Sequence, residues 1–128
     1  MGEVISEEMR EQLLRTCRTT IGEEFRSLTY FTPDEYEHIY LREDLERGED
    51  PLVFVENERQ GFTSQRTYEW SELGSYRYTI RSFENGNLVR VIVGKHGAYM
   101  TTDPLSMDRF DELSEAVTAV LEEIEARS

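Results

Sequence analysis

Apolar residues recur at every fourth position near the start of the chain. They are Met9, Leu13, Cys17 and Ile21. This spacing is typical of an amphipathic helix. Ser6 is a suitable N-cap and Gly22 a suitable stop, so we predict a helix from about Ser6 to Thr20. A short strand from Phe25 to Phe31 follows it.

The strongest local signal is the segment Thr32-Pro33-Asp34-Glu35. Threonine at the N-cap, proline at the first helical position and glutamate at the third form a capping box. Phe31 and Tyr36 flank it as a hydrophobic staple. The pattern therefore predicts a helix from Thr32 to about Leu45.

The same kind of helix start recurs at Asp50-Pro51. The spacing of Leu52, Val55 and Phe62 favours a helix from Asp50 to Gln60, although the apolar run from Leu52 to Val55 also fits a strand. We predict a polar connection from Phe62 to Gly74, and it carries the only tryptophan, Trp70.

From Ser75 the apolar period changes to two, which predicts a three-stranded antiparallel meander. Its strands are Tyr76–Arg81, Leu88–Val93 and Ala98–Thr102, and its turns are Asn85-Gly86 and Lys95-His96. Asn-Gly is the strongest short hairpin signal. A final apolar stripe predicts a helix from near Ser106 to the end of the ordered chain.

These elements predict a single α+β domain over residues 1–128, with an ordered part of about 5–126. The antiparallel sheet has about four strands, and the C-terminal meander supplies three of them. We expect the N- and C-terminal helices on one face of the sheet. The two middle helices then lie at its edge or over the other face.

Alternation along the predicted strands sorts their side chains into two faces. The core face carries Tyr76, Tyr78, Ile80, Val89, Val91, Val93, Ala98 and Met100. The opposite face carries Arg77, Arg81 and Arg90, with Phe83, Ile92 and Tyr99 around them. This opposite face is the candidate partner-binding or anion-binding face.

In the predicted register Arg81 lies opposite Arg90, and like charges placed so are unfavourable. We therefore expect a negative group over the arginines. It is supplied by the chain's own glutamates, by a second copy of the protein, or by an anionic ligand. The first is favoured because the middle helices are rich in glutamate: Glu35, Glu37, Glu43, Glu46, Glu56 and Glu58.

The composition adds a statement about the environment. The net charge is −13 over 128 residues, and Lys95 is the only lysine among 14 lysines and arginines, against 27 acidic residues. Acidic repulsion favours solubility but opposes compaction, and salt at 1 M screens it within about 3 Å. We therefore expect a halophile's cytoplasm. The acidity also argues against direct nucleic-acid binding, which needs a basic surface.

Other signals mainly exclude classes of protein. No apolar run approaches the roughly 18 residues of a membrane helix, and the start lacks the basic region of a signal peptide. Cys17 is the only cysteine, so no intrachain disulfide forms. We expect no membrane contact and no cofactor.

The sequence shows no catalytic motif. Asp34, His38 and Arg42 would share one face of the predicted helix, but charge pairing explains them more simply than a metal site. His96 lies in a glycine-flanked turn, and a residue that merely belongs to the turn is a simpler interpretation than an acid-base catalyst. Neither histidine comes with a nucleophile and an oxyanion donor. We therefore predict that the protein is not an enzyme, with no catalytic or metal-binding residues.

Several stretches resemble a family of small acidic proteins of halophilic archaea. They are Tyr30–Tyr36, Phe54–Arg59, Tyr76–Gly86, Val91–Gly94, Thr101–Asp103 and the segment to Arg109-Phe110. The similarity spans about residues 8–122. It carries no established activity, so it implies no catalytic residues.

The order of the elements is similar to that of roadblock and profilin-type domains. These domains place two helices on one sheet face and commonly dimerise or dock partners. A roadblock domain has two strands before its middle helix, whereas only one is predicted here. We therefore predict a non-enzymatic interaction or regulatory module, homodimeric or bound to another protein. The alternative is a sensor of an anionic small molecule, gripped by Arg77, Arg81 and Arg90.

Overall fold

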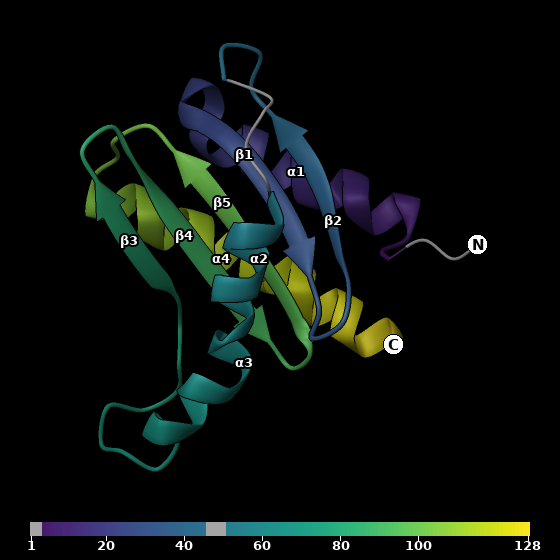
Figure 1. Cartoon of the computed structure of the whole chain (residues 1–128), viewed down its shortest axis with the longest axis vertical. Coiled ribbons are helices and arrows are strands. Elements are labelled where there is room, and N and C mark those ends of the chain that lie inside the picture. Colours follow the sequence, from purple (N-terminus) through teal and green to yellow (C-terminus); the bar gives the residue numbers. More distant parts are fainter. Residues whose placement is uncertain (1–3, 46–50) are drawn as a thin grey trace.

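The computed structural model describes residues 4–45 and 51–128. Five strands form one antiparallel sheet in the order β2-β1-β5-β4-β3, with helices on both faces (Figure 1). The strands are β1 (Phe25–Phe31), β2 (Tyr36–Leu41), β3 (Thr79–Phe83), β4 (Gly86–Val93) and β5 (His96–Thr102). The helices are α1 (Glu7–Ile21), α2 (Pro51–Arg59), α3 (Gly61–Ser64) and α4 (Met107–Arg127), with short 3-10 turns η1 (Gly22–Glu24) and η2 (Gln65–Tyr68).

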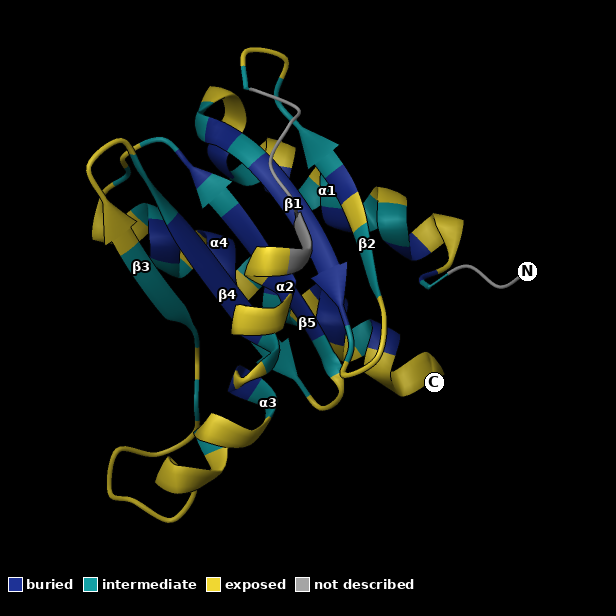
Figure 2. Ribbon diagram, in the orientation of Figure 1, coloured by how far each residue is buried: buried dark blue, intermediate teal, exposed yellow. Residues whose placement is uncertain are grey.

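The main core lies between the sheet and the two long helices, α1 and α4 (Figure 2). The predicted apolar stripe of α1 is fully buried there. Ser6 is the N-cap of α1, since its Oγ accepts a hydrogen bond from the Met9 backbone N–H at 3.2 Å. Gly22 ends the helix with a φ of 56°, a conformation that favours glycine. The predicted placement of both terminal helices on one face is confirmed.

The predicted helix from Thr32 to about Leu45 is wrong, because this segment enters strand β2. The threonine still acts as a cap: its Oγ1 accepts from the backbone N–H of Glu35 at 3.0 Å. In this chain that bond closes the tight turn of the β1–β2 hairpin, and Phe31 pairs with Tyr36 across it. The staple residues are thus a cross-strand pair, and the sheet has five strands rather than about four.

A bulge shapes the β1–β2 pairing. Leu28 pairs with Tyr40 but Thr29 pairs with His38, so Ile39 is an extra residue on β2. Both Ile39 and Tyr40 pack toward α1 as a result. Tyr40 stacks on Phe25 with ring centroids 4.5 Å apart. The bulge therefore supplies the core with one more side chain than a regular strand would.

Both predicted turns of the meander are displaced. Phe83 pairs with Gly86 and Val93 with His96, so the turns are Glu84-Asn85 and Gly94-Lys95. Gly86 is needed for a close approach instead, because a Cβ there would collide with the backbone oxygen of Thr102. In both hairpins the pairing register differs from the predicted one by two residues. Because side chains alternate with a period of two, each side chain of the strands stays on its predicted face. Arg81 lies opposite Leu88, however, and Arg90 lies opposite Thr79.

The face prediction is wrong for the segment before β3. Tyr76 and Arg77 precede the strand, which begins at Thr79, so the alternation does not extend to them. The Tyr76 hydroxyl donates to the backbone oxygen of Arg90 at 3.0 Å, and the Arg90 guanidinium lies over the Tyr76 ring. Arg77 instead reaches α4, where it pairs with Asp111 at 3.4 Å.

The predicted middle helix is confirmed as α2, although its expected start at Asp50 lies outside the described residues. The predicted polar connection is partly helical, since it contains α3 and η2. Helix α2 lies over the sheet face opposite α1 and α4 (Figure 1). Within the described ranges, no helix is long and apolar enough to cross a membrane.

Candidate interaction surface

A row of polar side chains crosses the whole sheet beneath α2. In strand order these residues are His38, Thr29, Tyr99, Arg90 and Thr79, each paired in register with the next. Two hydrogen bonds join neighbours in the row. Thr29 Oγ1 contacts His38 Nδ1 at 2.9 Å, and Arg90 Nη2 donates to Thr79 Oγ1 at 2.9 Å. The α2 face of the sheet is therefore not a simple apolar surface.

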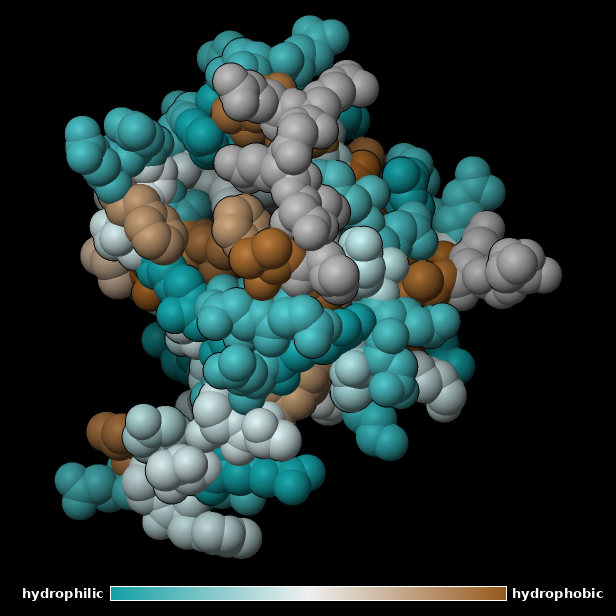
Figure 3. All heavy atoms as spheres, viewed as in Figure 1, coloured by the Kyte–Doolittle hydropathy of each residue, from teal (hydrophilic) through white to brown (hydrophobic). Residues whose placement is uncertain are grey.

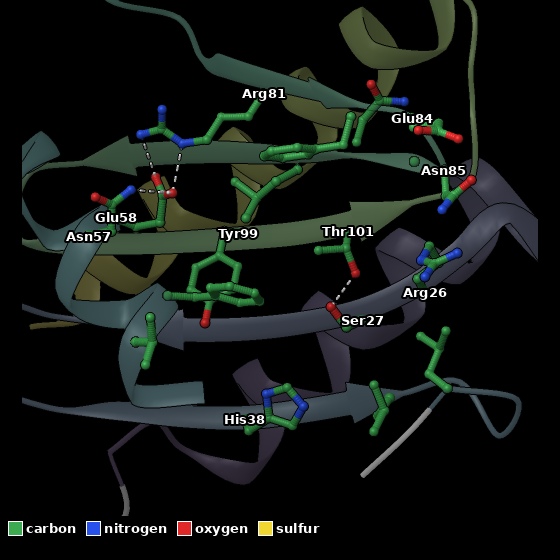
Figure 4. A pocket seen from close by; sticks show the side chains of 18 of the residues that line it. Arg26, Ser27, His38, Asn57, Glu58, Arg81, Glu84, Asn85, Tyr99 and Thr101 are labelled. Atoms are coloured by element: carbon green, nitrogen blue, oxygen red, sulfur yellow. Dashed lines mark hydrogen bonds and ion pairs between the residues drawn. The ribbon is translucent and has the colours of Figure 1, made fainter. Parts of the chain in front are cut away.

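Glu58 of α2 supplies the negative charge that the sequence calls for over the arginines. Its carboxylate accepts from Arg90 Nη1 at 3.1 Å. It also accepts from Arg81 Nε at 2.9 Å (Figure 4). The Glu58 and Arg90 side chains are almost fully buried, with 2% and 5% exposed, whereas the Arg81 side chain is 38% exposed. The hydrogen bond to Glu58 raises the pKa of Arg81.

A small apolar cluster holds the C-terminal half of α2 on the sheet beside this ion pair. It consists of Phe31, Val55, Leu88 and Tyr99, with Tyr36, Phe62 and Ile92 at its margin. Gly61 follows α2 closely, and a Cβ there would lie 2.6 Å from Arg90 Cζ. Tight packing at Gly61 and the Glu58 ion pair together fix where α2 sits.

Beyond α2, the ends of the strands leave a groove of about 1590 Å³. Its floor includes Ser27 and Thr101, whose hydroxyls are 2.5 Å apart, and its wall includes Glu58 and Arg81 (Figure 4). Apolar side chains gather over α2 and the β3–β4 end of the sheet (Figure 3). Val53, Phe54 and Phe83 line the groove although they are 63%, 41% and 64% exposed.

The groove reaches the β3 edge of the sheet. Arg81 and Phe83 of β3 line it, together with Glu84 and Asn85 of the following turn. In the part of the chain that the structure describes, no strand pairs with the outer side of β3. An open strand edge and exposed apolar side chains thus lie next to each other.

The structure divides the predicted site residues into three groups. Arg90 and Tyr99 are buried beneath α2, and Ile92 packs at the margin of the same cluster. Arg81 and Phe83 remain accessible at the groove. Arg77 belongs to the other side of the sheet, where it contacts α4.

Sequence reasoning missed Val53, Phe54 and His38 as members of this surface. Val53 and Phe54 precede Val55 in an apolar run, and only contact with the sheet shows that Val55 is buried whereas Val53 and Phe54 are exposed. His38 was assigned to a helix, so its position opposite Thr29 was not foreseen. Tyr36 packs with the cluster under α2, whereas the bulge turns Tyr40 toward α1, so no regular alternation marks this strand in the sequence.

The protein environment also changes the ionisation of two side chains at this surface, the buried Tyr99 and the exposed His38. Burial raises the pKa of Tyr99. The Tyr99 hydroxyl and Arg90 Nε have no hydrogen-bond partner within the described residues. The pKa of His38 is lowered, because surrounding protein atoms displace part of its water. No group of three or more His, Cys, Asp or Glu side chains that could hold a metal ion occurs in residues 4–45 and 51–128.

A second polar cluster lies at the far end of the sheet. The Tyr30 hydroxyl contacts His96 Nδ1 at 2.6 Å, and His96 Nε2 lies 3.1 Å from Glu125 of α4. Burial, with Glu35 and Glu125 nearby, raises the pKa of Tyr30 to about 12. The cluster ties the β4–β5 turn to α4.

The model of one protein family matches residues 11–122 of the chain. The chain belongs to the family "Domain of unknown function (DUF7522)". No curated protein matches the sequence.

Solved structures identify the fold. The gliding protein MglB from Thermus thermophilus superposes with a TM-score of 0.67 at 12% identity, covering 94% of this chain and 96% of that one. A structure described as "MglB with tetrameric arrangement" gives a TM-score of 0.66 at 13% identity, with the same coverage. Myxococcus xanthus MglB gives 0.63 at 12% identity, covering 95% and 96%. The domain therefore has the roadblock-type α/β fold of MglB. A roadblock domain has two strands before its middle helix, and β2 is the one of these two that the sequence prediction lacked.

Proposed function

We propose that this protein is a non-enzymatic interaction module that works as a homodimer. The contact between copies is the outer edge of β3 together with the adjoining surface of α2. The observation that carries the proposal is the open β3 edge beside the exposed side chains of Val53, Phe54 and Phe83.

The geometry of the β3–β4 hairpin makes β3 suitable for pairing. Its turn has two residues, so the flanking pair Phe83 and Gly86 is hydrogen-bonded and alternate pairs follow that pattern. The backbone amides of Ile80 and Ser82 therefore point away from β4. Such unpaired amides are a ready template for another strand.

The two edges of the sheet differ in regularity. Strand β2, at the other edge, pairs with β1 through a bulge, and bulges are one way in which proteins blunt an edge. Strand β3 pairs with β4 in unbroken register over all five of its residues. Regular geometry at β3 favours it as the edge that takes a second copy.

Assembly has a precedent in this fold. One of the similar MglB structures is described as having a tetrameric arrangement. Closed twofold contacts are the commonest way in which soluble chains associate. We therefore propose a twofold dimer of the present chain. Its setting is the cytoplasm of a halophile, where salt screens the repulsion between the acidic surfaces of the two copies.

The alternative, an anion sensor on the arginine face, has less support. Glu58 already provides a carboxylate to Arg81 and Arg90. An anionic ligand would have to displace that buried carboxylate from Arg90. The geometry therefore supports an interaction surface better than a small-molecule site.

The proposal is tested by Ser82→Pro, measured by light scattering and circular dichroism. Proline removes an amide that faces away from β4, which an edge strand tolerates, so we expect a folded monomer. Ser82→Ala is the matched control because it keeps the amide and should stay dimeric. A Ser82→Pro protein that is folded and still dimeric would place the interface elsewhere.

A further inference from the structure

Residues 65–75, here called the arm, project from the body of the domain between α3 and β3 (Figure 1). From Arg66 to Ser75 every residue is exposed. Three of them are large and apolar: Tyr68 is 57% exposed, Trp70 96% and Leu73 80%. Single exposed apolar residues are normal, but here three large apolar side chains are exposed within one short segment, which points to a contact surface.

The arm is held firmly at its base and only locally at its tip. Tyr76 bonds to the Arg90 backbone, and the Tyr78 hydroxyl bonds to Asp111 of α4. The hydrogen bonds of the tip are short-range turns, such as Glu69 to Arg66 and Ser71 to Tyr68. The hydrogen bonds of Tyr76 and Tyr78 thus fix the point at which the arm leaves the domain, and the rest of the chain does not cover Trp70.

The arm and the groove lie at opposite ends of β3. The arm leads into the strand at Thr79, whereas the groove is lined by Phe83 at the other end. Five residues of strand span roughly 15 Å. The arm therefore does not cover the groove of its own chain.

A twofold axis brings an arm and a groove together. An axis perpendicular to the sheet pairs the two copies of β3 antiparallel and keeps both α2 helices on one face. The Thr79 end of one copy then lies beside the Phe83 end of the other. Each arm emerges next to the partner's groove, and the two contacts are equivalent.

We propose that the arm of each protomer docks in the groove of a second copy, with Trp70 contacting the side chains of Val53, Phe54 and Phe83 in that groove. This inference rests on the proposed dimer and adds the contact by which one copy recognises the other. A large aromatic side chain seated in an apolar pocket is the usual centre of such a contact. In the dimer, the arm of one copy fills the groove that is empty in a single chain.

The test uses the intrinsic fluorescence of Trp70, which is the only tryptophan, recorded at about 2 M KCl, a salt level that screens charges beyond about 3 Å. Light scattering at the same protein concentrations gives the fraction of dimer. We expect the emission to shift to the blue, and quenching by acrylamide to fall, as the dimer forms. Dilution to monomer should restore the spectrum of a fully hydrated indole.

Substitution of the groove separates docking from dimerisation. The double variant Val53→Asn with Phe54→Asn leaves β3 and the arm unchanged, but it also removes two apolar side chains from the proposed dimer contact. Its emission is therefore compared with that of the wild type at concentrations where light scattering gives the same fraction of dimer, and there Trp70 should return to hydrated emission. The control is Met107→Asn, which changes an equally exposed apolar residue on α4 and should leave the spectrum of the dimer unaltered.

The outcomes distinguish the two proposals. A dimer whose Trp70 stays hydrated overturns arm docking and leaves the proposed dimer standing. A dimer whose blue-shifted emission survives in the groove variant also overturns docking in this groove. A monomer at every concentration overturns both proposals.

Discussion

Glu58 shows at the scale of one residue how this fold positions its middle helix. A buried carboxylate needs partners, because desolvation of an unpaired charge is costly. Arg81 and Arg90 supply them from two adjacent strands. The ion pair therefore specifies where α2 lies on the sheet, which apolar packing alone would specify less sharply.

Glu58→Gln should destabilise the protein by about 3 kcal/mol, because removal of one partner leaves a buried charge uncompensated. Glu56→Gln is the matched control. It is two residues away on α2 and removes only the exposed pair with Arg59, so it should cost less than about 1 kcal/mol. Urea unfolding of both variants measures the difference. Equal losses would show that the buried pair does not anchor α2.

Cys17 should be inert in the folded protein. It is buried in the main core, and burial raises the pKa of its thiol to about 12, whereas the thiolate is the reactive form. Labelling by a thiol reagent near neutral pH should be slow in the native state and fast in urea. Rapid native labelling would mean that α1 opens readily from the sheet.

At the scale of elements, β2 shows where the sequence was ambiguous. Thr32-Pro33-Asp34-Glu35 forms the cap hydrogen bond that was predicted, but a helix and a hairpin turn use the same local bond. The decision came from pairing with β1, of which only the last residue, Phe31, belongs to the local pattern around the cap. Such non-local contacts routinely override local propensity.

The sequence was most informative where one period runs through a whole element. The stripe of α1 and the alternation of β4 and β5 were predicted correctly, and Arg81 and Phe83 were placed on the α2 face. The first turn of the meander was misplaced because Gly86 permits a close approach to Thr102 and does not form a left-handed turn. Arg77 failed because alternation predicts a face only within a strand.

Asp103 joins three elements and makes the fold sensitive to acid. It accepts from Arg42 at 2.8 Å and from Arg26 at 3.1 Å, and these bonds lower its pKa below the usual 3.8. A depressed carboxyl pKa stabilises the folded state above the unfolded pKa, and this contribution is lost as the pH falls through the folded pKa.

Asp103→Asn should therefore cost about 1 kcal/mol at pH 7. The gap in unfolding free energy from the wild type should close as the pH falls through the lowered pKa of Asp103, below the usual 3.8. Asp44→Asn is the control. It removes a partner of Arg42 that lies in solvent, and its effect should be smaller. Urea unfolding across the acid range measures both gaps. A gap for Asp103→Asn that stays constant to the lowest pH would contradict this assignment.

At the scale of the whole molecule, the charge of −13 opposes both folding and association at low salt. Ion pairs at the surface recover little of this, because exposed pairs contribute about 0–1 kcal/mol each. Screening of the general repulsion is the larger effect. Salt should therefore act on stability and on dimerisation in the same direction.

The melting temperature should rise as KCl increases from 0.1 M to about 2 M, where the screening length falls from about 10 Å to below 3 Å. Each kcal/mol gained corresponds to roughly 4 °C for a domain of this size. Measurement at a fixed low protein concentration keeps dimerisation from contributing. A melting temperature that stays level or falls would show that specific ion pairs outweigh the general repulsion.

The measurement that tests the central claim most directly is the mass of the unmodified chain in about 2 M KCl, where charges are screened beyond about 3 Å. Light scattering should be recorded over a wide range of protein concentration. The account predicts twice the chain mass of 15.1 kDa at high concentration, with a reversible fall toward the monomer on dilution. A mass of 15.1 kDa throughout would contradict it.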